Sequence, residues 1–449
     1  MAELYELTVA DAAAQIKTGK LSPLDLTKSI LDRIRILEPQ LKTWVYLDEE
    51  SVLIDAKEKE ADVIRGIPIG PLHGVPIGLK DIYYTAGIPT TACSKVYADF
   101  VPEYDATTVS KLKQAGALIL GKTVTTEFAC ADPSPTINPW NSAHTPGGSS
   151  SGSAVSVASR MCPAALGSQT VGSVLRPASY NGVVGFKPTL GRVSRCGVIP
   201  VSWTLDTMGW MTRTVSDAAI LLSVMAGHDK NDPISSGAEV PEYLEILASE
   251  HRPRIGILRE FFLENSDDET EKHFLQVVKL LADSGANVVE LAIPESFSTV
   301  IGDQQTIMAV EGAAFHRPMY DVRSEDYRPK IRSMIQRGID TDAVSYSYAL
   351  ERRLQFVADM ADLADEVDIL MTPSTPTPAL PDVTNTGNTM FQGPWTYCGL
   401  PAITIPSGLS ASGMPLGIQL ASGNLQESLL LSSAKWCESV LNVELRPNI

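Results

Sequence analysis

The first part of the chain alternates hydrophobic and polar residues with the period of amphipathic helices. In "SPLDLTKSILDRIRILEP" apolar residues recur every three or four positions, with Ser22 at the cap position and Pro23 in the first turn. Farther along, "GVPIGLKD" and "ALILGKTV" are short apolar runs bounded by glycine and proline, which is typical of buried strands. The pattern predicts helices at 8–19, 22–39, 49–65 and 105–116, and strands at 74–81 and 117–124.

The rest of the chain continues to exchange strands and helices, which favours an α/β fold. Residues 145–200 are rich in Gly, Ser and Pro, yet apolar residues are interleaved among them, unlike in a true linker. We find neither a repeat nor a linker, so we expect one large domain over 1–449, with a helical segment at 1–65, a core at 66–225 and a variable helical region with terminal strands at 226–449. The other predicted elements are a helix at 215–227, a loop at 228–250, strands at 252–260 and 286–293 around a helix at 267–284, mostly helix at 306–365, a strand and Pro-rich loop at 367–380, and a strand pair at 400–408 and 415–422.

The composition narrows the class of protein. Of the 449 residues, 44% are hydrophobic and 20% are charged, which suits a globular chain with a sizeable core. The formal net charge of −17 argues against binding to nucleic acid or to an anionic membrane, because both need a basic face. The six cysteines lie far apart, no signal peptide is evident, and no apolar run has the ~18 residues of a membrane span, so we expect free thiols and a cytoplasmic location.

Several short motifs match catalytic patterns but lack the context that those patterns need. "GSSSG" matches the G-x-S-x-G elbow of serine hydrolases at Ser150, but the preceding "NPWNSAHTP" is polar and does not read as a buried strand. An S-x-x-K match at Ser110 lies in an amphipathic helix and reads as helix surface. The six histidines are scattered and no G-K-[ST] follows the Gly-rich loop, so we expect neither a metal site nor a nucleotide site.

Three segments hold side chains that could act together in acyl transfer. Lys80 ends an apolar strand, where burial disfavours the ammonium and favours a neutral amine that can act as a base. Ser149 lies in the Gly/Ser loop, and Ser173 follows Gly172 in a turn whose backbone N–H groups can form an anion-binding nest. One interpretation is a base, a relay and a nucleophile beside an oxyanion hole. From spacing alone, a loop that only packs against the sheet is the better explanation of the pattern.

A longer set of motifs runs in a fixed order through most of the chain. It comprises "GPLHGVPIGLKD", "GGSSSGSA", "GSQTVGSVLRP", "GVVGFKPT", "LDTMGWMTRTVSDA", "DILMTPSTPTPA" and "GLPAITIPSG". As a set, these segments closely resemble the motifs of the amidase signature family. The resemblance implies a single α/β domain whose central mixed β-sheet is covered by helices on both faces, and it implies no cofactor.

The resemblance also implies a Ser–cis-Ser–Lys triad. Carried onto the matching positions, Ser173 would be the nucleophile, Ser149 a proton relay that follows an unusual cis peptide, and Lys80 the base. The implied reaction is attack of the nucleophile on an amide carbonyl, departure of the amine and hydrolysis of the acyl-enzyme by water. The implied oxyanion-hole donors are the backbone N–H groups of Thr170, Val171 and Gly172, with Ser173 left open as a fourth.

The turn that carries Ser173 departs from the family pattern T-D-x-G-G-S-I-R. Gln169 replaces the acidic residue, Val171 replaces a glycine, and Arg176 comes one position late. An Asp–Arg pair near the nucleophile would therefore become a Gln–Arg pair. These changes leave the implied triad intact and suggest a subgroup with a different pocket.

The substrate is less determined than the chemistry. "NTMFQGPWTYCGLP" supplies Met390, Phe391, Trp395 and Tyr397, which, together with Cys130 and Ala131, form either an apolar pocket or part of the core. On the pocket interpretation, we expect a stand-alone amidohydrolase for a small apolar or aromatic amide, with esters, anilides or carbamates as further substrates.

Two other functions stay open. One is the glutamine-hydrolysing A subunit of a tRNA-dependent amidotransferase, although "AVSYSYALERRLQFVADMADL" matches its Gly-Tyr-Tyr-Asp-like helix poorly. The other is a catalytically inactive family member used for binding, against which the intact triad argues. We expect a small-molecule substrate as the partner, and a homodimer is left open.

Overall fold

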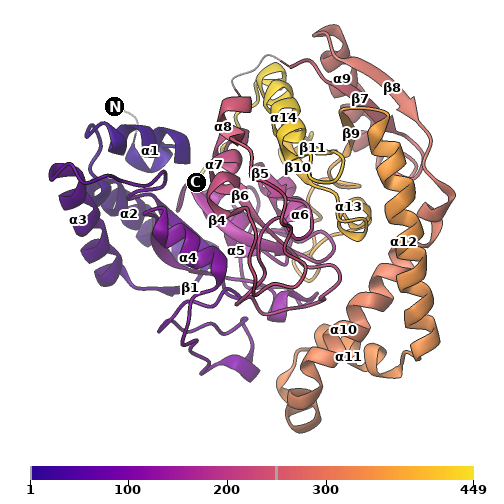
Figure 1. The fold of residues 1–449 in the computed structure, drawn as a ribbon, viewed down its shortest axis with the longest axis horizontal. Coiled ribbons are helices and arrows are strands. Elements are labelled where there is room, and N and C mark those ends of the chain that lie inside the picture. Colours follow the sequence, from indigo (N-terminus) through magenta and orange to yellow (C-terminus); the bar gives the residue numbers. More distant parts are fainter. Residues whose placement is uncertain (1–2, 248–250) are drawn as a thin grey trace.

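A long mixed β-sheet runs through the protein from one end to the other (Figure 1). The computed structural model describes residues 3–247 and 251–449. Within these residues eleven strands form one sheet in the order β1-β3-β2-β4-β6-β5-β10-β11-β9-β7-β8. The strands are β1 (Trp44–Leu47), β2 (Pro76–Lys80), β3 (Leu118–Thr123), β4 (Ala164–Gln169), β5 (Val184–Lys187), β6 (Thr207–Thr212), β7 (Arg254–Leu258), β8 (Asn287–Leu291), β9 (Ile369–Pro373), β10 (Ala402–Leu409) and β11 (Pro415–Ala421).

Helices flank the sheet, so the α/β class and the mixed central sheet are confirmed. The helices are α1 (Val9–Lys17), α2 (Pro23–Leu41), α3 (Glu49–Ile64), α4 (Thr107–Gln114), α5 (Ser151–Ala158), α6 (Leu175–Asn181), α7 (Val215–Met225), α8 (Tyr243–Ile246), α9 (Asp268–Asp283), α10 (Val300–Arg323), α11 (Pro329–Asp340), α12 (Ala343–Asp365), α13 (Gly393–Tyr397) and α14 (Glu427–Leu441). Short 3₁₀ segments lie at Leu4–Glu6, Lys95–Tyr97, Glu127–Ala129, Glu295–Thr299 and Ser324–Asp326.

The predicted N-terminal helices are confirmed, and one strand lies between them. The Ser22 side chain accepts the backbone N–H of Asp25 at the start of α2, as the cap pattern predicts. The segment 1–65 is not wholly helical, however, because β1 pairs antiparallel with β3 at the edge of the sheet. β1 is a four-residue strand, and its position depends on pairing with residues some 75 positions later.

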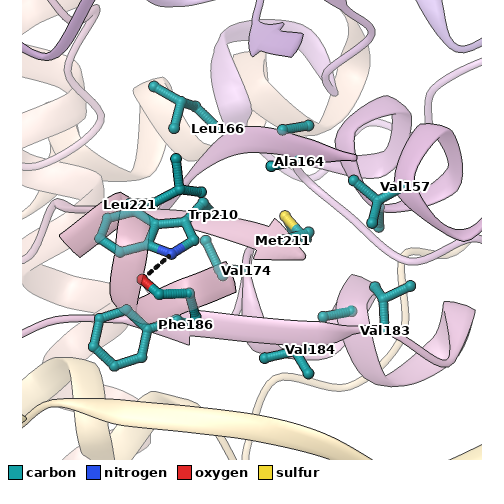
Figure 2. Packing of buried hydrophobic residues seen from close by; sticks show 14 of the residues in the cluster. Val157, Ala164, Leu166, Val174, Val183, Val184, Phe186, Trp210, Met211 and Leu221 are labelled. Atoms are coloured by element: carbon teal, nitrogen blue, oxygen red, sulfur yellow. Dashed lines mark hydrogen bonds between the residues drawn. The ribbon is translucent and has the colours of Figure 1, made fainter. Parts of the chain in front are cut away.

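The centre of the sheet packs against helices through large apolar side chains (Figure 2). Trp210 on β6 is fully buried and lies beside Leu221 of α7. Its ring contacts that of Phe186 on β5 in a tilted arrangement, with ring centroids 5.2 Å apart. Its indole nitrogen donates to the carbonyl of Ala218, also on α7, at 3.2 Å, so the one polar atom of the ring is satisfied. This core holds β4, β5 and β6 rigidly beneath the loops that follow them.

The sheet topology brings two chain segments together that are far apart in sequence. β2 lies between β3 and β4 and is parallel to both, with Leu79 opposite Leu166. Parallel neighbours present their carboxyl ends at the same edge of a sheet. The end of β2 at Lys80 therefore meets the end of β4 and the turn that follows Gln169.

A separate group of long helices, α10, α11 and α12, packs together beside the C-terminal half (Figure 1). It confirms the predicted helical region at 306–365. The predicted loop at 228–250 contains the short α8, and its positions 248–250 lie outside the described residues. Among the helices that the structure describes, none combines the length and the apolar character needed to cross a membrane.

Candidate active site

Lys80 lies at the carboxyl end of β2 and is fully buried. Its Nζ donates hydrogen bonds to the Oγ atoms of Ser149, at 2.7 Å, and Ser168, at 2.9 Å. Burial lowers the pKa of Lys80 from its ordinary 10.5 to about 7, and the carboxylate of Asp206 partly opposes this shift. The amine therefore exchanges between its charged and neutral forms near neutral pH, as a general base must.

Ser149 stands on the Gly/Ser loop that leads into α5. The peptide bond between Gly148 and Ser149 is cis, so the predicted cis geometry is confirmed. The Ser149 carbonyl accepts the backbone N–H of Thr126 at 3.1 Å and the hydroxyl of Thr125 at 3.2 Å. Gly147 just before it has φ +75°, in the left-handed region that favours glycine. The loop is thus anchored to the segment after β3, with the Ser149 hydroxyl held against Lys80.

The neighbouring residues of this loop serve packing. Ser150, which the elbow pattern selects, is fully buried, and its Oγ accepts the backbone N–H of Ser168 at 3.4 Å. At Gly152 an added Cβ would lie 2.5 Å from the Thr43 carbonyl oxygen and from the Val124 nitrogen. The small residues therefore let this loop and the start of α5 pass close to other backbone, which explains the linker-like composition.

Ser173 lies in the turn between β4 and α6, and Gln169 supports this turn. The Gln169 amide oxygen accepts the N–H groups of Val174 and Leu175 at 2.9 and 3.0 Å. Its Nε2 donates to Thr396 Oγ1 at 3.0 Å. The N–H groups at the start of α6 are thereby paired by a side chain, as in a helix cap.

The turn also presents unpaired backbone donors. Among the hydrogen bonds recorded for residues 3–247 and 251–449, none is donated by the N–H groups of positions 170–173. Thr170 Oγ1 donates to Asp206 at 2.6 Å, and the Val171 carbonyl accepts from Thr396 at 2.8 Å, so the turn is fixed without these N–H groups. Such a run of free amides can bind an oxyanion.

A cavity of about 720 Å³ lies beside the two serine loops. Ser149 and Ser173 both line it, and Thr170 and Val171 add the turn. Across the described residues no hydrogen bond joins the Ser149 and Ser173 hydroxyls; each instead faces the same space. Two serines, a buried amine and free amides at one cavity are the parts needed for acyl transfer by a serine nucleophile.

The model of the amidase family matches residues 25–431 of the chain. The chain belongs to the amidase signature family. It is 38% identical to "Putative amidase AmiD" of Mycobacterium tuberculosis, over 99% of this chain and 96% of that protein. It is 35% identical to one of the subunits of the glutamyl-tRNA(Gln) amidotransferase of Desulforapulum autotrophicum, over 96% of each chain. Among solved structures, native peptide amidase from Stenotrophomonas maltophilia superimposes with a TM-score of 0.87 at 30% identity, over 99% of this chain and 98% of that one.

This family member does not form the Gln–Arg pair that its sequence suggested. Gln169 is bound to the turn and to Thr396, whereas Arg176 reaches the other serine loop. Arg176 donates to the Gly148 carbonyl and to the Gly387 carbonyl, both at 2.6 Å. The guanidinium thus braces the carbonyl side of the cis peptide against the loop around position 387.

The expected pocket residues divide between cavity and core. Cys130 and Ala131 line the cavity, as does Met390. For Phe391 and Trp395 the pocket interpretation is wrong, because both are fully buried in a core cluster with Phe262. An aromatic run near the site looks like a pocket in sequence, but both rings pack against Phe262, which follows β7, with ring centroids 5.1 and 5.9 Å away.

The rest of the wall comes from elements that the sequence did not single out. It consists of one face of α10, one face of α11 and the loop at 385–389. An amphipathic helix pattern marks which residues turn inward but not whether they meet core or cavity. Across the described residues no cluster of three or more His, Cys, Asp or Glu could hold a metal ion.

Proposed function

We propose that the protein hydrolyses an amide through an acyl-enzyme on Ser173. Neutral Lys80 takes the proton of Ser149, which takes that of Ser173 as the Ser173 oxygen attacks the carbonyl. The resulting oxyanion accepts hydrogen bonds from the N–H groups at 170–172, each worth roughly 3 kcal/mol of barrier. The relay returns the proton to the leaving amine, and water hydrolyses the acyl-enzyme by the same route.

One observation carries this proposal. Lys80 is fully buried, its pKa is lowered to about 7, and it donates at 2.7 Å to Ser149, which lines the same cavity as Ser173. A buried amine with no carboxylate in direct contact is costly for a purely structural residue, and its perturbed pKa suits catalysis. Membership in the amidase signature family supports the same chemistry.

The substrate we propose is a small amide with an apolar part. Ile301, Met308, Met334 and Met390 contribute apolar side chains to the cavity wall. A cavity of about 720 Å³ accepts a small molecule, and flexible methionines adapt to its shape. Esters and carbamates present the same carbonyl geometry and are proposed as further substrates, tested with a matched amide, anilide, ester and carbamate panel.

The decisive experiment replaces Ser173 with alanine. Ser173→Ala should abolish turnover of the whole panel and prevent labelling by a fluorophosphonate probe, read by mass spectrometry at position 173. Ser333→Ala is the matched control, because Ser333 lines the same cavity from α11 but lies far from the turn in sequence and is exposed. Turnover by purified Ser173→Ala protein, or loss of labelling in Ser333→Ala alone, contradicts the assignment.

A second candidate function is hydrolysis of glutamine within an amidotransferase, favoured by the 35% identity to a component of glutamyl-tRNA(Gln) amidotransferase. The two functions differ in substrate and in partner. Glutaminase activity that appears only with partner proteins would support the second candidate, and hydrolysis of simple amides by the isolated chain would support the first. A chain that neither reacts with the probe nor turns over any amide would instead be a binding member of the family.

A further inference from the structure

The cavity wall is positively charged, although the chain is strongly negative. The formal net charge is −17, yet the charged residues among the described cavity-lining positions are Arg176, Lys330 and Arg337, with no Asp or Glu. A wall of one sign, opposite to the charge of the whole molecule, concentrates ligands of the opposite sign. The charge distribution is therefore informative about the substrate.

Arg176 is the innermost of these cations. It is only 4% exposed, and its two terminal nitrogens bind neutral acceptors, the carbonyls of Gly387 and Gly148 and the Thr386 hydroxyl. Its Nε is buried and has no hydrogen-bond partner among the described residues. A buried guanidinium that meets no carboxylate keeps an uncompensated charge, which an anionic ligand can neutralise.

The other two cations lie at the outer part of the wall on α11. Lys330 Nζ donates to the Thr384 carbonyl at 2.9 Å, so it is held beside the loop that forms the wall. Arg337 lies two turns farther along the helix, is exposed, and forms no ion pair within the described part of the chain. A flexible cation at a cavity mouth attracts an anion during approach and pairs with it after binding.

Carboxylates near the cavity are already engaged. Asp132 accepts the N–H groups of Lys330 and Ile331 at the start of α11, at 3.1 and 2.8 Å. Asp206 accepts Thr170 Oγ1 and two backbone N–H groups behind the turn. Asp382 accepts the N–H and hydroxyl of Thr384 at 2.8 and 2.7 Å. None of these side chains lines the cavity, so none can bind a substrate ammonium there.

We propose that the preferred substrates are amides that carry a carboxylate or comparable anionic group, bound by the Arg176, Lys330 and Arg337 cluster. This inference deepens the proposed amide hydrolysis and rests on it. Because the cavity wall also has apolar side chains, the proposed substrate has an apolar body and one anionic end. It also disfavours free glutamine, whose α-ammonium would enter a cationic cavity without an acidic partner.

The test uses three isosteric anilides with the wild-type chain. Glutaryl 4-nitroanilide carries a terminal carboxylate, valeryl 4-nitroanilide is neutral, and 5-aminopentanoyl 4-nitroanilide is cationic. A second pair, 4-acetamidobenzoate and acetanilide, places the carboxylate on the amine side. We expect kcat/KM to be at least about tenfold higher for the anionic than for the neutral member of one pair, and to be lowest for the cationic anilide. The preference for the anionic member should fall as the salt concentration rises from about 0.05 to 0.5 M.

Variants of α11 locate the effect. Lys330→Gln combined with Arg337→Gln should cut the ratio of kcat/KM for the anionic over the neutral anilide to within about threefold, mainly through a higher KM for the anionic substrate. Arg332→Gln is the matched control, because Arg332 lies on the same helix, outside this cavity, and pairs with Glu325 at 2.9 Å. Arg176 is left unchanged in the test because it also braces the cis-peptide loop.

The outcomes separate this inference from the proposed function. Equal or better turnover of the neutral members of both pairs, or a preference that the double variant leaves intact, overturns the anionic preference while leaving amide hydrolysis standing. Absence of turnover for every amide, together with no probe labelling at Ser173, overturns the proposed function itself. A drop for all substrates in the Arg332→Gln control would show that α11 acts through packing and would also overturn the charge assignment.

Discussion

The strongest prediction concerns the acidic limb of the pH profile, which Lys80 should set. The lowering of its pKa from 10.5 to about 7 corresponds to about 5 kcal/mol in favour of the neutral amine. With a pKa of about 7, the neutral fraction rises from about 10% at pH 6 to about 90% at pH 8. kcat/KM for a neutral amide should therefore rise about tenfold over this interval and then level off.

The perturbation that tests this assignment is Asp206→Asn. The Asp206 carboxylate is the largest influence that raises the pKa of Lys80 against the effect of burial. The asparagine oxygen can still accept the backbone N–H groups of Val201 and Ser202, which bind Oδ2 of Asp206. Its NH2 group then takes the Oδ1 position and can donate to the Thr170 hydroxyl, so both contacts can persist without the charge. Without the charge the pKa of Lys80 falls further, so the limb should move to lower pH while the plateau rate changes less.

The assay is kcat/KM from pH 5 to 9 with a neutral anilide whose own ionisation lies outside that range. Substrate or buffer titration is excluded by repeating the profile with a second neutral amide. A flat wild-type profile, with chemistry shown to limit the rate, would refute Lys80 as the base. A limb that stays in place or moves to higher pH in Asp206→Asn would refute the electrostatic link between the two residues.

Three further predictions follow from the same contacts. Lys80→Met should abolish turnover. Because the pKa of Lys80 is lower in the folded than in the unfolded protein, the stability of the wild type rises between pH 7 and pH 10.5. The variant, which lacks this ionisation, should therefore gain more in Tm over the wild type at pH 7 than at pH 9.5, as measured by scanning calorimetry. Gln169→Leu should lower kcat and Tm together, because it leaves the N–H groups of Val174 and Leu175 without an acceptor. Gln169→Glu keeps the acceptor oxygen but adds a charge, so it should move the acidic limb of the pH profile to higher pH. Identical pH profiles of kcat/KM for the two variants would contradict this. Trp395→Ala should lower the free energy of unfolding by about 3–5 kcal/mol with KM unchanged in the remaining folded protein. Met390→Ala, at a partly buried residue of the cavity wall, should change KM with a smaller loss of stability; steady-state kinetics and chemical denaturation distinguish the two variants.

Local sequence signals predicted elements wherever the deciding physics is local. Ser22 and Pro23 mark the start of α2 because capping and proline geometry act within one turn. The final strand pair was also predictable, since β10 and β11 are joined by a short turn. β1 was missed because its four residues become a strand only by pairing with β3. The sheet order, in which β6 lies between β4 and β5, likewise depends on contacts that no local pattern encodes.

The candidate site likewise contains residues that a local sequence signal predicts and residues that it does not. Lys80, Ser149 and Ser173 were predictable because the family motifs place them on short, ordered segments. The cavity walls on α10 and α11 were not, because an inward-facing Met334 looks the same in sequence whether it borders core or open space. The pocket interpretation was wrong for Phe391 and Trp395, because a large ring in a segment near an active site can also be buried against another core residue, here Phe262.

The replacement of an acidic residue by Gln169 links Lys80, the proposed base, to the charge of the cavity. Gln169 follows Ser168, whose hydroxyl binds Lys80, so a carboxylate at this position would favour the ammonium and raise the pKa of the base. The amide supplies the same acceptor oxygen to Val174 and Leu175 without that charge. It also offers no counter-ion to Arg176, whose hydrogen-bond acceptors within residues 3–247 and 251–449 are all neutral. On the proposed mechanism, a neutral residue at position 169 adds no charge that would raise the pKa of Lys80, and it leaves the Arg176 guanidinium for the anionic end of the proposed substrate.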